Sequence, residues 1–281
     1  MTTAQRLPRR TLLLSAAASM ARAATPPRFA HRQASMRETG AAVFALARRI
    51  PGLSGVELQI HYQGQTLWDR DTMLAYRRAA ADAGIAIPSL SGVWEKGVSL
   101  RQTTPGEQSL RRSIAAAEAL GARVILVAAF RDNCPRMDEE SSFGPVVAML
   151  RKVSPAAQSA GVILGLETSL SPADDAKLAG LVGSPAVKTY FDLDNTEFYG
   201  HTGQSLTGIR TLGKAGICQV HCKNEDRLLE EPGRVNWTAA IQALKQTGYD
   251  GWFVFETRHS SAEQCVSATA RNIAFLRRLL A

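Results

Sequence analysis

Four side chains of the kinds that bind hard metal ions stand at the ends of four short apolar segments in the second half of the chain. They are Glu167 in VILGLET, Asp192 in KTYFDLD, His221 in ICQVHCK and Glu256 in WFVFETR. Their separations of 25, 29 and 35 residues are typical of successive strand–helix units. In a closed parallel barrel, such strand ends converge on one face. Three carboxylates and one imidazole would form a site there for one divalent cation.

Each of these residues alone also has an ordinary structural explanation. A carboxylate at a strand end is often a polar terminus or a helix cap, and a histidine inside a strand is often a hydrogen-bonded core residue. Together they favour a metal site, because burying several uncompensated carboxylates in one place is very costly. The set therefore predicts a cation that balances them.

The elements that must position these residues follow a regular order. Apolar segments of a few residues alternate with helical stretches, and glycines such as Gly84, Gly121, Gly161 and Gly248 end helices just before the next strand. Strands are expected near 28–35, 55–60, 86–91, 123–128, 162–167, 187–192, 217–222 and 252–256. Helices are expected near 38–49, 69–83, 108–120, 143–160, 173–181, 204–214, 236–247 and 262–280. Eight strand–helix units predict one (β/α)8 TIM barrel, an α/β fold, as a single domain over residues 26–281.

The first 25 residues have the pattern of an export signal rather than of the barrel. Arg9 and Arg10 precede the apolar run TLLLSAAASM, and Ala21-Arg22-Ala23 offers a cleavage site. Paired arginines in this position predict a twin-arginine signal peptide over residues 1–25, with a Sec signal or an alanine-rich starting helix as alternatives. The run is too short to span a membrane. We therefore expect a periplasmic or secreted protein with no membrane attachment after cleavage.

Charge and cysteine content exclude some classes of function. The chain has a net charge of +8, of which four arginines lie in the first 25 residues, so residues 26–281 carry only +4. No stripe of Lys and Arg with interleaved aromatic residues is present, so nucleic acid is not expected as a partner. Cys134, Cys218, Cys222 and Cys265 lack zinc-finger spacing and are interpreted as small core residues.

Several stretches together resemble a known family. GLETSLSP, YFDLDNTEFYG, VHCKNEDR and GRVNWTAAIQALKQTGYDGWFVFET are similar to the sugar phosphate isomerase/epimerase superfamily with the xylose isomerase-like TIM barrel, and SIAAAEALGARVILV matches its third helix and fourth strand. Relatives include D-tagatose 3-epimerase, hydroxypyruvate isomerase and inosose dehydratase. The resemblance covers about residues 28–280. Its motifs are specific for the superfamily but not for one member.

The resemblance implies both a cofactor and a reaction. The cofactor would be one Mn²⁺, Mg²⁺, Co²⁺ or Zn²⁺ held by Glu167, Asp192, His221 and Glu256. The two glutamates would exchange protons with a sugar through a metal-stabilised enediolate. Return of the proton to the opposite face of the same carbon gives an epimer, and return to the neighbouring carbon gives an isomer.

Residues around the same face are candidates for substrate contact. They are Lys223 and Arg227 after the seventh strand, Glu57 and His61 around the end of the second, Trp94 after the third, and Asn195 after the sixth. The resemblance implies the role of Arg227, Lys223 could reach a substrate oxygen, and Trp94 could stack on a sugar face. Their ordinary explanations are solvated loop charges and packing at the barrel mouth. Asn195 stands where some epimerases carry a histidine, which argues against a close match to D-tagatose 3-epimerase.

Two other functions stay open at this stage. The same first step could lead to elimination, which would make the protein a lyase or dehydratase of a keto-sugar or inosose. A non-catalytic sugar-binding barrel is the alternative from another class. Endonuclease IV is disfavoured because its three-zinc cluster needs more histidines than the five present. Because phosphorylated sugars are scarce outside the cytoplasm, the expected substrate is a non-phosphorylated sugar, polyol or keto-sugar, and a homo-oligomer is compatible with the sequence.

Overall fold

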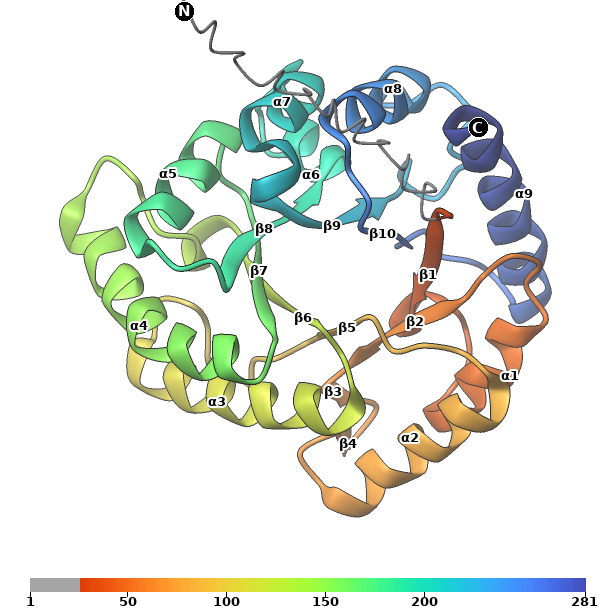
Figure 1. Cartoon of the computed structure of the whole chain (residues 1–281), viewed down its shortest axis with the longest axis horizontal. Coiled ribbons are helices and arrows are strands. Elements are labelled where there is room, and N and C mark those ends of the chain that lie inside the picture. The colour runs from red at the N-terminus through yellow and green to blue at the C-terminus, as the bar shows by residue number, and fades with distance from the viewer. Residues whose placement is uncertain (1–25) are drawn as a thin grey trace, which may run out of the picture.

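The protein is a closed barrel of eight parallel strands surrounded by helices (Figure 1). The computed structural model describes residues 26–281, so the predicted twin-arginine signal lies outside the described residues. The barrel strands are β1 (Arg28–Arg32), β2 (Gly55–Gln59), β5 (Ser89–Ser91), β6 (Val124–Ala129), β7 (Ile163–Thr168), β8 (Val187–Asp192), β9 (Ile217–Cys222) and β10 (Trp252–Phe255). β1 pairs with β10 and closes the barrel. The predicted (β/α)8 fold is therefore confirmed.

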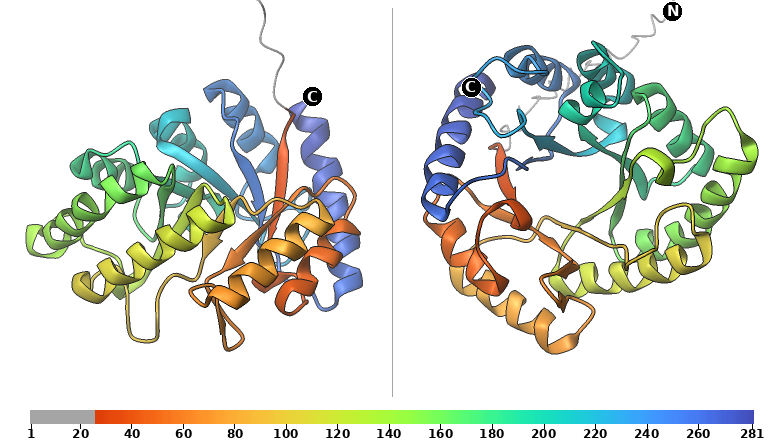
Figure 2. Two further views of the ribbon diagram at one scale, coloured as in Figure 1. Left: turned by 60° about the horizontal axis from the view of Figure 1, so that its bottom comes forward. Right: turned by 180° about the vertical axis from the view of Figure 1, so that it is seen from behind.

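Helices cover the outside of the barrel on all sides (Figure 2). They are α1 (Val43–Arg48), α2 (Arg70–Ala83), α3 (Thr103–Leu120), α4 (Glu140–Ser159), α5 (Pro172–Val182), α7 (Gln204–Gly216), α8 (Trp237–Thr247) and α9 (Ala262–Leu280). The sequence did not predict the short helix α6 (Leu193–Phe198) or the hairpin of β3 (His61–Tyr62) and β4 (Gln65–Thr66). None of the helices within residues 26–281 is long and apolar enough to cross a membrane.

Local sequence signals explain where the helices begin and end. The Asp69 carboxylate accepts a hydrogen bond from the Thr72 backbone N–H at 2.8 Å and so caps α2, and Asn236 caps α8 in the same way through Ala239. Gly84 ends α2 at φ 65°, a left-handed conformation that glycine adopts without steric cost. Local side-chain caps and glycines thus set these helix boundaries.

Alternation along each strand separates the barrel interior from the helix layer. Ala30, Val124, Leu126, Tyr190 and Val254 form a small apolar cluster, apart from the large cluster in which the strands pack against the helices. Alternation therefore directs Arg32 and Glu256, two residues after Ala30 and Val254, to the same interior side. The inner cluster forms the floor beneath the carboxyl ends of the strands.

Gly165 in β7 allows close packing in this interior. A Cβ atom at this position would lie 2.7 Å from Cys218 Sγ and 3.1 Å from Tyr190 Cβ, distances that would force neighbouring atoms to move. The absence of a side chain two residues before Glu167 thus lets Tyr190 fill the space below the site.

The cysteines behave as the sequence predicted. All four are free, and Cys134, Cys222 and Cys265 are buried. Burial raises the pKa of the Cys218 thiol to about 12 and that of Cys265 to about 11. These two thiols are therefore protonated at neutral pH when no cation is bound to them.

Candidate metal centre

The four predicted ligands meet at the carboxyl ends of neighbouring strands. Glu167 lies in β7, Asp192 ends β8, His221 lies in β9, and Glu256 directly follows β10. Each offers one ligand atom, and these atoms all lie within 4.8 Å of one another. One coordination sphere can span that distance, so the spatial convergence expected from the sequence is present.

His221 faces the three carboxylates through one ring nitrogen. Its Nδ1 atom lies 3.0 Å from Glu167 Oε1, 3.5 Å from Glu256 Oε2 and 3.8 Å from Asp192 Oδ2. The imidazole is completely buried. Nδ1 is therefore the nitrogen positioned to bind a cation between these oxygens.

The donor set fits a divalent cation in type and in charge. Asp192 Oδ2 is buried and has no well-directed hydrogen bond among the described residues, although it lies 2.8 Å from Lys223 Nζ. The three carboxylates and the adjacent Glu57 face only two cationic side chains, Lys223 and Arg32. With His221 neutral, two negative charges remain, which a divalent ion would balance.

The pKa values of Asp192 and His221 are both raised in this cluster. Burial raises the pKa of Asp192 to about 7, against the opposing effect of Lys223. Burial alone would lower the pKa of His221, but Glu256, Glu167 and Glu57 raise it well above its ordinary value. The carboxylates thus favour a proton on His221. A bound cation would neutralise the same carboxylates in place of that proton.

Lys223 and Asn195, both predicted as substrate contacts, lie inside the cluster. Lys223 Nζ lies 2.8 Å from Glu256 Oε2 and donates to Asn195 Oδ1 at 3.0 Å. The Asn195 side chain in turn donates to Glu167 Oε1 at 3.1 Å, and its backbone N–H donates to Asp192 Oδ1 at 2.9 Å. These two side chains therefore position the ligands and also border the space that a substrate would occupy.

Arg32 is a site residue that the sequence analysis missed. It ends β1 and forms an ion pair with Glu256. Burial would raise the pKa of Glu256, but His221, Lys223 and Arg32 together hold it well below its usual range. The segment RFAHRQAS is weakly apolar, so its register as a strand, and with it the inward direction of Arg32, was hard to recognise.

The structure corrects the predicted role of Glu57. Its side chain is completely buried in the barrel interior, where Ser89 and Tyr190 donate hydrogen bonds to Oε2 at 2.8 and 2.7 Å. Its other oxygen lies 3.4 Å from His221 Nε2. Glu57 therefore lies behind the imidazole, without a hydrogen bond to it, and is too buried to contact a substrate at the mouth.

Three other predicted contacts have partners other than the four predicted ligands. Arg227 forms an ion pair with Glu225, donates to the Pro232 carbonyl at 2.9 Å and lines a neighbouring cavity. The His61 ring packs edge-on against Trp68, with 4.3 Å between ring centroids. Trp94 donates its indole N–H to the Ala128 carbonyl at 2.7 Å and supports the barrel wall. Their positions depend on loop conformations that strand spacing does not determine.

An open cavity of about 620 Å³ lies beside the cluster, and of the four predicted ligands Glu256 lines it. Asn195, Lys223 and Glu256 line the side of the cavity that adjoins the cluster. Its lining contains four acidic residues, four basic residues and one aromatic residue. The acidic ones are Asp194, Glu225, Asp226 and Glu256, the basic ones are Arg32, Lys223, Arg234 and Arg258, and the aromatic one is Phe198. Phe198 is 49% exposed, the one large apolar side chain so exposed within residues 26–281. The sequence did not predict Phe198 as a cavity residue, because helix α6, which ends at Phe198, was not expected.

The basic residues of this cavity are all engaged by acids. Arg258 pairs with Asp226 at 2.9 Å, and Arg234 pairs with Glu225 at 2.7 Å and with Asp194 at 3.3 Å. Arg32 and Lys223 contact Glu256. Within the described part of the chain, the cavity therefore presents a polar surface without an unpaired cation.

Comparison with known proteins assigns this chain to a family. Residues 44–279 match the xylose isomerase-like TIM barrel family. A curated relative, 2-epi-5-epi-valiolone 7-phosphate 2-epimerase of an Actinoplanes species, is 31% identical over 165 residues. That match covers 58% of this chain and 60% of the relative, so the chain spans less than two thirds of the relative's length.

Solved structures share the whole barrel at low sequence identity. The apo form of 3-keto-D-glucoside 4-epimerase from E. coli superimposes with a TM-score of 0.73 at 16% identity, covering 90% of this chain and 100% of that one. D-allulose 3-epimerase from a Methylomonas species, in complex with D-allulose, gives 0.73 at 16% identity over 91% and 98%. These likenesses establish the fold. With the family match over residues 44–279, they show that this chain belongs to the xylose isomerase-like TIM barrel family.

Proposed function

We propose that this protein is a divalent-metal-dependent epimerase or isomerase of a non-phosphorylated sugar, polyol or keto-sugar. The observation that carries the proposal is the convergence of Glu167, Asp192, His221 and Glu256 within 4.8 Å, beside an open cavity that Glu256 lines. Three carboxylates and an imidazole suit Mn²⁺, Mg²⁺, Co²⁺ or Zn²⁺. When bound, the ion would polarise a substrate carbonyl and stabilise the negative charge that develops next to it.

The side chains of this chain supply the proton transfers. Arg32 and Lys223 keep Glu256 ionised, so it can accept a proton from a carbon next to the carbonyl. Glu167 offers a second carboxylate, which Asn195 orients by a hydrogen bond of 3.1 Å. With a substrate carbon between them, one carboxylate removes the proton and the other returns one. The carbon that receives the proton decides between epimerisation and isomerisation.

The charge pattern of the cavity supports a neutral substrate. Arg32, Lys223, Arg234 and Arg258 are each paired with an acid, so a phosphate group would have to break existing ion pairs. The partly exposed ring of Phe198 offers an apolar surface on which the face of a sugar ring could pack. The name of the Actinoplanes relative includes a 7-phosphate, which makes phosphorylation the point on which the two proteins would differ.

Solvent-deuterium exchange tests this function. The purified protein, loaded with Mn²⁺, would be incubated in D₂O with free ketoses, keto-glycosides and inososes and with phosphorylated counterparts. We expect deuterium on the carbon next to the carbonyl of a free substrate, together with an epimer or isomer. Glu167→Gln and Glu256→Gln should each reduce exchange by about 10²- to 10⁴-fold, while Glu118→Gln on the exposed side of α3 should leave it unchanged.

The same experiment separates the alternatives. An unsaturated product with loss of a hydroxyl would identify a lyase, which shares the first proton transfer. Binding without any carbon-bound exchange would identify a sugar-binding barrel and contradict the proposed catalysis. Exchange restricted to phosphorylated substrates would contradict the proposed substrate class.

The place of action is also a proposal, and it rests on residues 1–25. The Arg9-Arg10 pair before an apolar run supports export by the twin-arginine route. Export of the full chain should therefore stop when both arginines are replaced by lysine. Unchanged export of that variant would contradict the twin-arginine route.

A further inference from the structure

A second group of metal-binding side chains lies outside the proposed active site. His31 in β1, His259 in the segment after β10, and Cys265 in the second turn of α9 each offer one ligand atom. These atoms lie within 4.8 Å of one another, and the three side chains are buried. Alternation along β1 turns His31 toward the helix layer, whereas its neighbour Arg32 faces Glu256 in the barrel interior.

The two imidazoles approach each other through the nitrogens that could bind an ion. His31 Nε2 and His259 Nε2 lie 3.1 Å apart. His31 Nδ1 lies 3.1 Å from the Arg32 carbonyl oxygen, to which it donates, so the lone pair of this ring is on Nε2. A backbone carbonyl that fixes the tautomer in this way is the usual outer partner of a metal-binding histidine.

Both rings are neutral, as ligation requires. Burial, with a smaller effect of His259, lowers the pKa of His31 to about 3. Burial also lowers the pKa of His259 to about 4. A simple hydrogen-bonded histidine pair would account for the 3.1 Å contact, but it would not need a thiol beside it.

Cys265 adds the sulfur ligand. Its Sγ atom has only a weak contact, 4.0 Å from Thr269 Oγ1, and it is completely buried. Burial keeps it a thiol without a cation, so an ion that binds there must displace the thiol proton. Two imidazoles and one thiolate form a soft donor set, unlike the three carboxylates and one imidazole of the first cluster.

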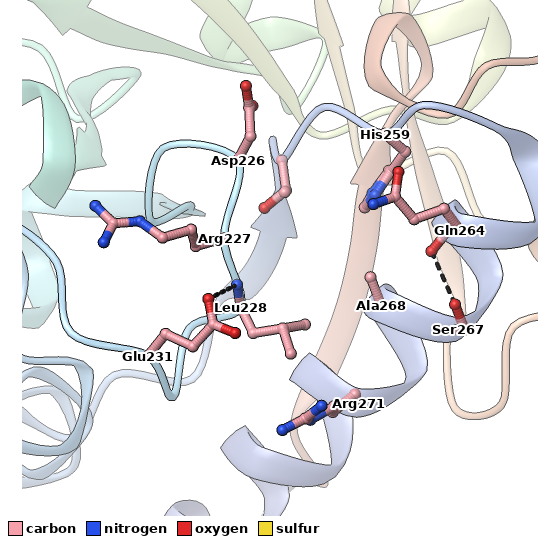
Figure 3. Close-up of a pocket in the computed structure, with 10 residues that line it drawn as sticks. Asp226, Arg227, Leu228, Glu231, His259, Gln264, Ser267, Ala268 and Arg271 are labelled. Carbon is pink, nitrogen blue, oxygen red and sulfur yellow. Dashed lines mark hydrogen bonds between the residues drawn. The ribbon is translucent and has the colours of Figure 1, made fainter.

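An open cavity of about 390 Å³ reaches one member of this group, His259 (Figure 3). It lies between the loop that carries Asp226 and Glu231 and helix α9, and His259 lines it. Thr257, 2% exposed, lines the same cavity, and its hydroxyl has no hydrogen-bond partner among residues 26–281. An ion could therefore approach from the His259 side, where the cavity leaves room for a water molecule as a fourth ligand.

We propose that His31, His259 and Cys265 form a second metal site, selective for a thiophilic ion such as Zn²⁺. The site would join β1, the segment after β10 and helix α9, where the first and last strands close the barrel. It would thereby hold in place the two strand ends that present Arg32 and Glu256. The inference does not depend on the function proposed above.

Cobalt spectroscopy tests this site without an activity assay. Co²⁺ would be titrated into the reduced, purified protein, and Zn²⁺ would then be added in competition. A thiolate–cobalt charge-transfer band is expected, with release of a proton, and Zn²⁺ should abolish the band. The Glu167, Asp192, His221 and Glu256 cluster contains no sulfur and cannot produce this band.

Two variants and a control assign the band to these residues. Cys265→Ser should remove it, and His259→Asn should weaken Zn²⁺ binding at this site by at least about 100-fold. Cys134→Ser, which alters another buried cysteine outside the cluster, should keep the band. Circular dichroism would verify that each variant folds. The absence of a thiolate band in the wild-type protein, or its persistence in Cys265→Ser, would overturn the proposal.

Discussion

His221 Nε2 lies 3.4 Å from a carboxylate oxygen of Glu57, and both side chains are completely buried. The opposite ring nitrogen, Nδ1, faces Glu167, Asp192 and Glu256. One imidazole thus joins the carboxylate of β2 to the ligands at the ends of β7, β8 and β10. Although no hydrogen bond joins Glu57 and His221 in this structure, Glu57 stands where a carboxylate orients a metal-binding histidine and increases its basicity.

Replacement of Glu57 by Gln should weaken metal binding while preserving the fold. The amide keeps the shape of the side chain, but it no longer offers a negative charge to His221. Loss of a carboxylate behind a metal-binding histidine typically lowers metal affinity by about 10- to 100-fold. Calorimetric titration with Mn²⁺ measures the effect, with Glu118→Gln as the control. An unchanged dissociation constant would show that Glu57 serves only the packing with Ser89 and Tyr190.

Lys223 should oppose metal binding and support catalysis. Its ammonium lies 2.8 Å from carboxylate oxygens of both Asp192 and Glu256, so it repels an incoming cation and shares its ligands. Lys223→Met should therefore raise Mn²⁺ affinity by roughly tenfold, or about 1.4 kcal/mol, and lower kcat/KM. Lys96→Met in the exposed loop after Trp94 should change neither. A loss of Mn²⁺ affinity in Lys223→Met would contradict this reading.

Phe198 should contribute to substrate binding rather than to the chemical step. If a sugar packs on its exposed ring, Phe198→Ala removes contact made equally in the ground and transition states. KM should rise by roughly tenfold, which corresponds to about 1.4 kcal/mol of apolar contact, with little change in kcat. Phe198→Trp should restore the KM of the wild-type protein. Equal KM values for all three forms would exclude a stacking role.

Asp175 in α5 should make stability depend on pH. Burial raises the pKa of this carboxyl from 3.8 to about 8, although Thr168 donates a hydrogen bond to it at 2.7 Å. The native state then binds more protons than the unfolded state between these two values, so stability falls as pH rises through this window. The slope from this group is at most about 1.4 kcal/mol per pH unit.

Asp175→Asn should remove that part of the slope. Urea unfolding between pH 4 and pH 8, compared with the wild-type protein, measures the difference, and the variant should be the more stable form at the upper end (about pH 8). Asp82→Asn on the exposed surface of α2 should retain the wild-type slope. Parallel stability curves for Asp175→Asn and the wild-type protein would show that Asp175 is ionised when buried.

The convergence of the four predicted ligands could be foreseen because each signal was local. Glu167, Asp192, His221 and Glu256 each follow a run of apolar residues, and strict strand–helix alternation implies that the ends of such runs share one face. All eight barrel strands were predicted, and all but β1 follow clear apolar runs. For these residues, the spacing along the sequence was enough to predict that they share one face of the barrel.

The remaining site residues depend on geometry that spacing does not contain. Arg32 was missed because the β1 segment is barely apolar, so its inward register was not evident. Glu57 was assigned to the mouth because its depth follows from the stagger of β2 against its neighbours. Arg227 was assigned to the substrate from the resemblance, and the sequence does not reveal its contacts with Glu225 and Pro232. His31 and His259 lie 228 residues apart and meet only because the barrel closes.

The position of the ion is the most direct test of the account. Crystals of the protein loaded with Mn²⁺ would be measured for anomalous scattering, since manganese prefers oxygen and imidazole ligands to thiolate. The account predicts one strong peak coordinated by Glu167, Asp192, His221 and Glu256. No peak at this position in fully loaded crystals, or a peak that contacts fewer than three of these side chains, would contradict it.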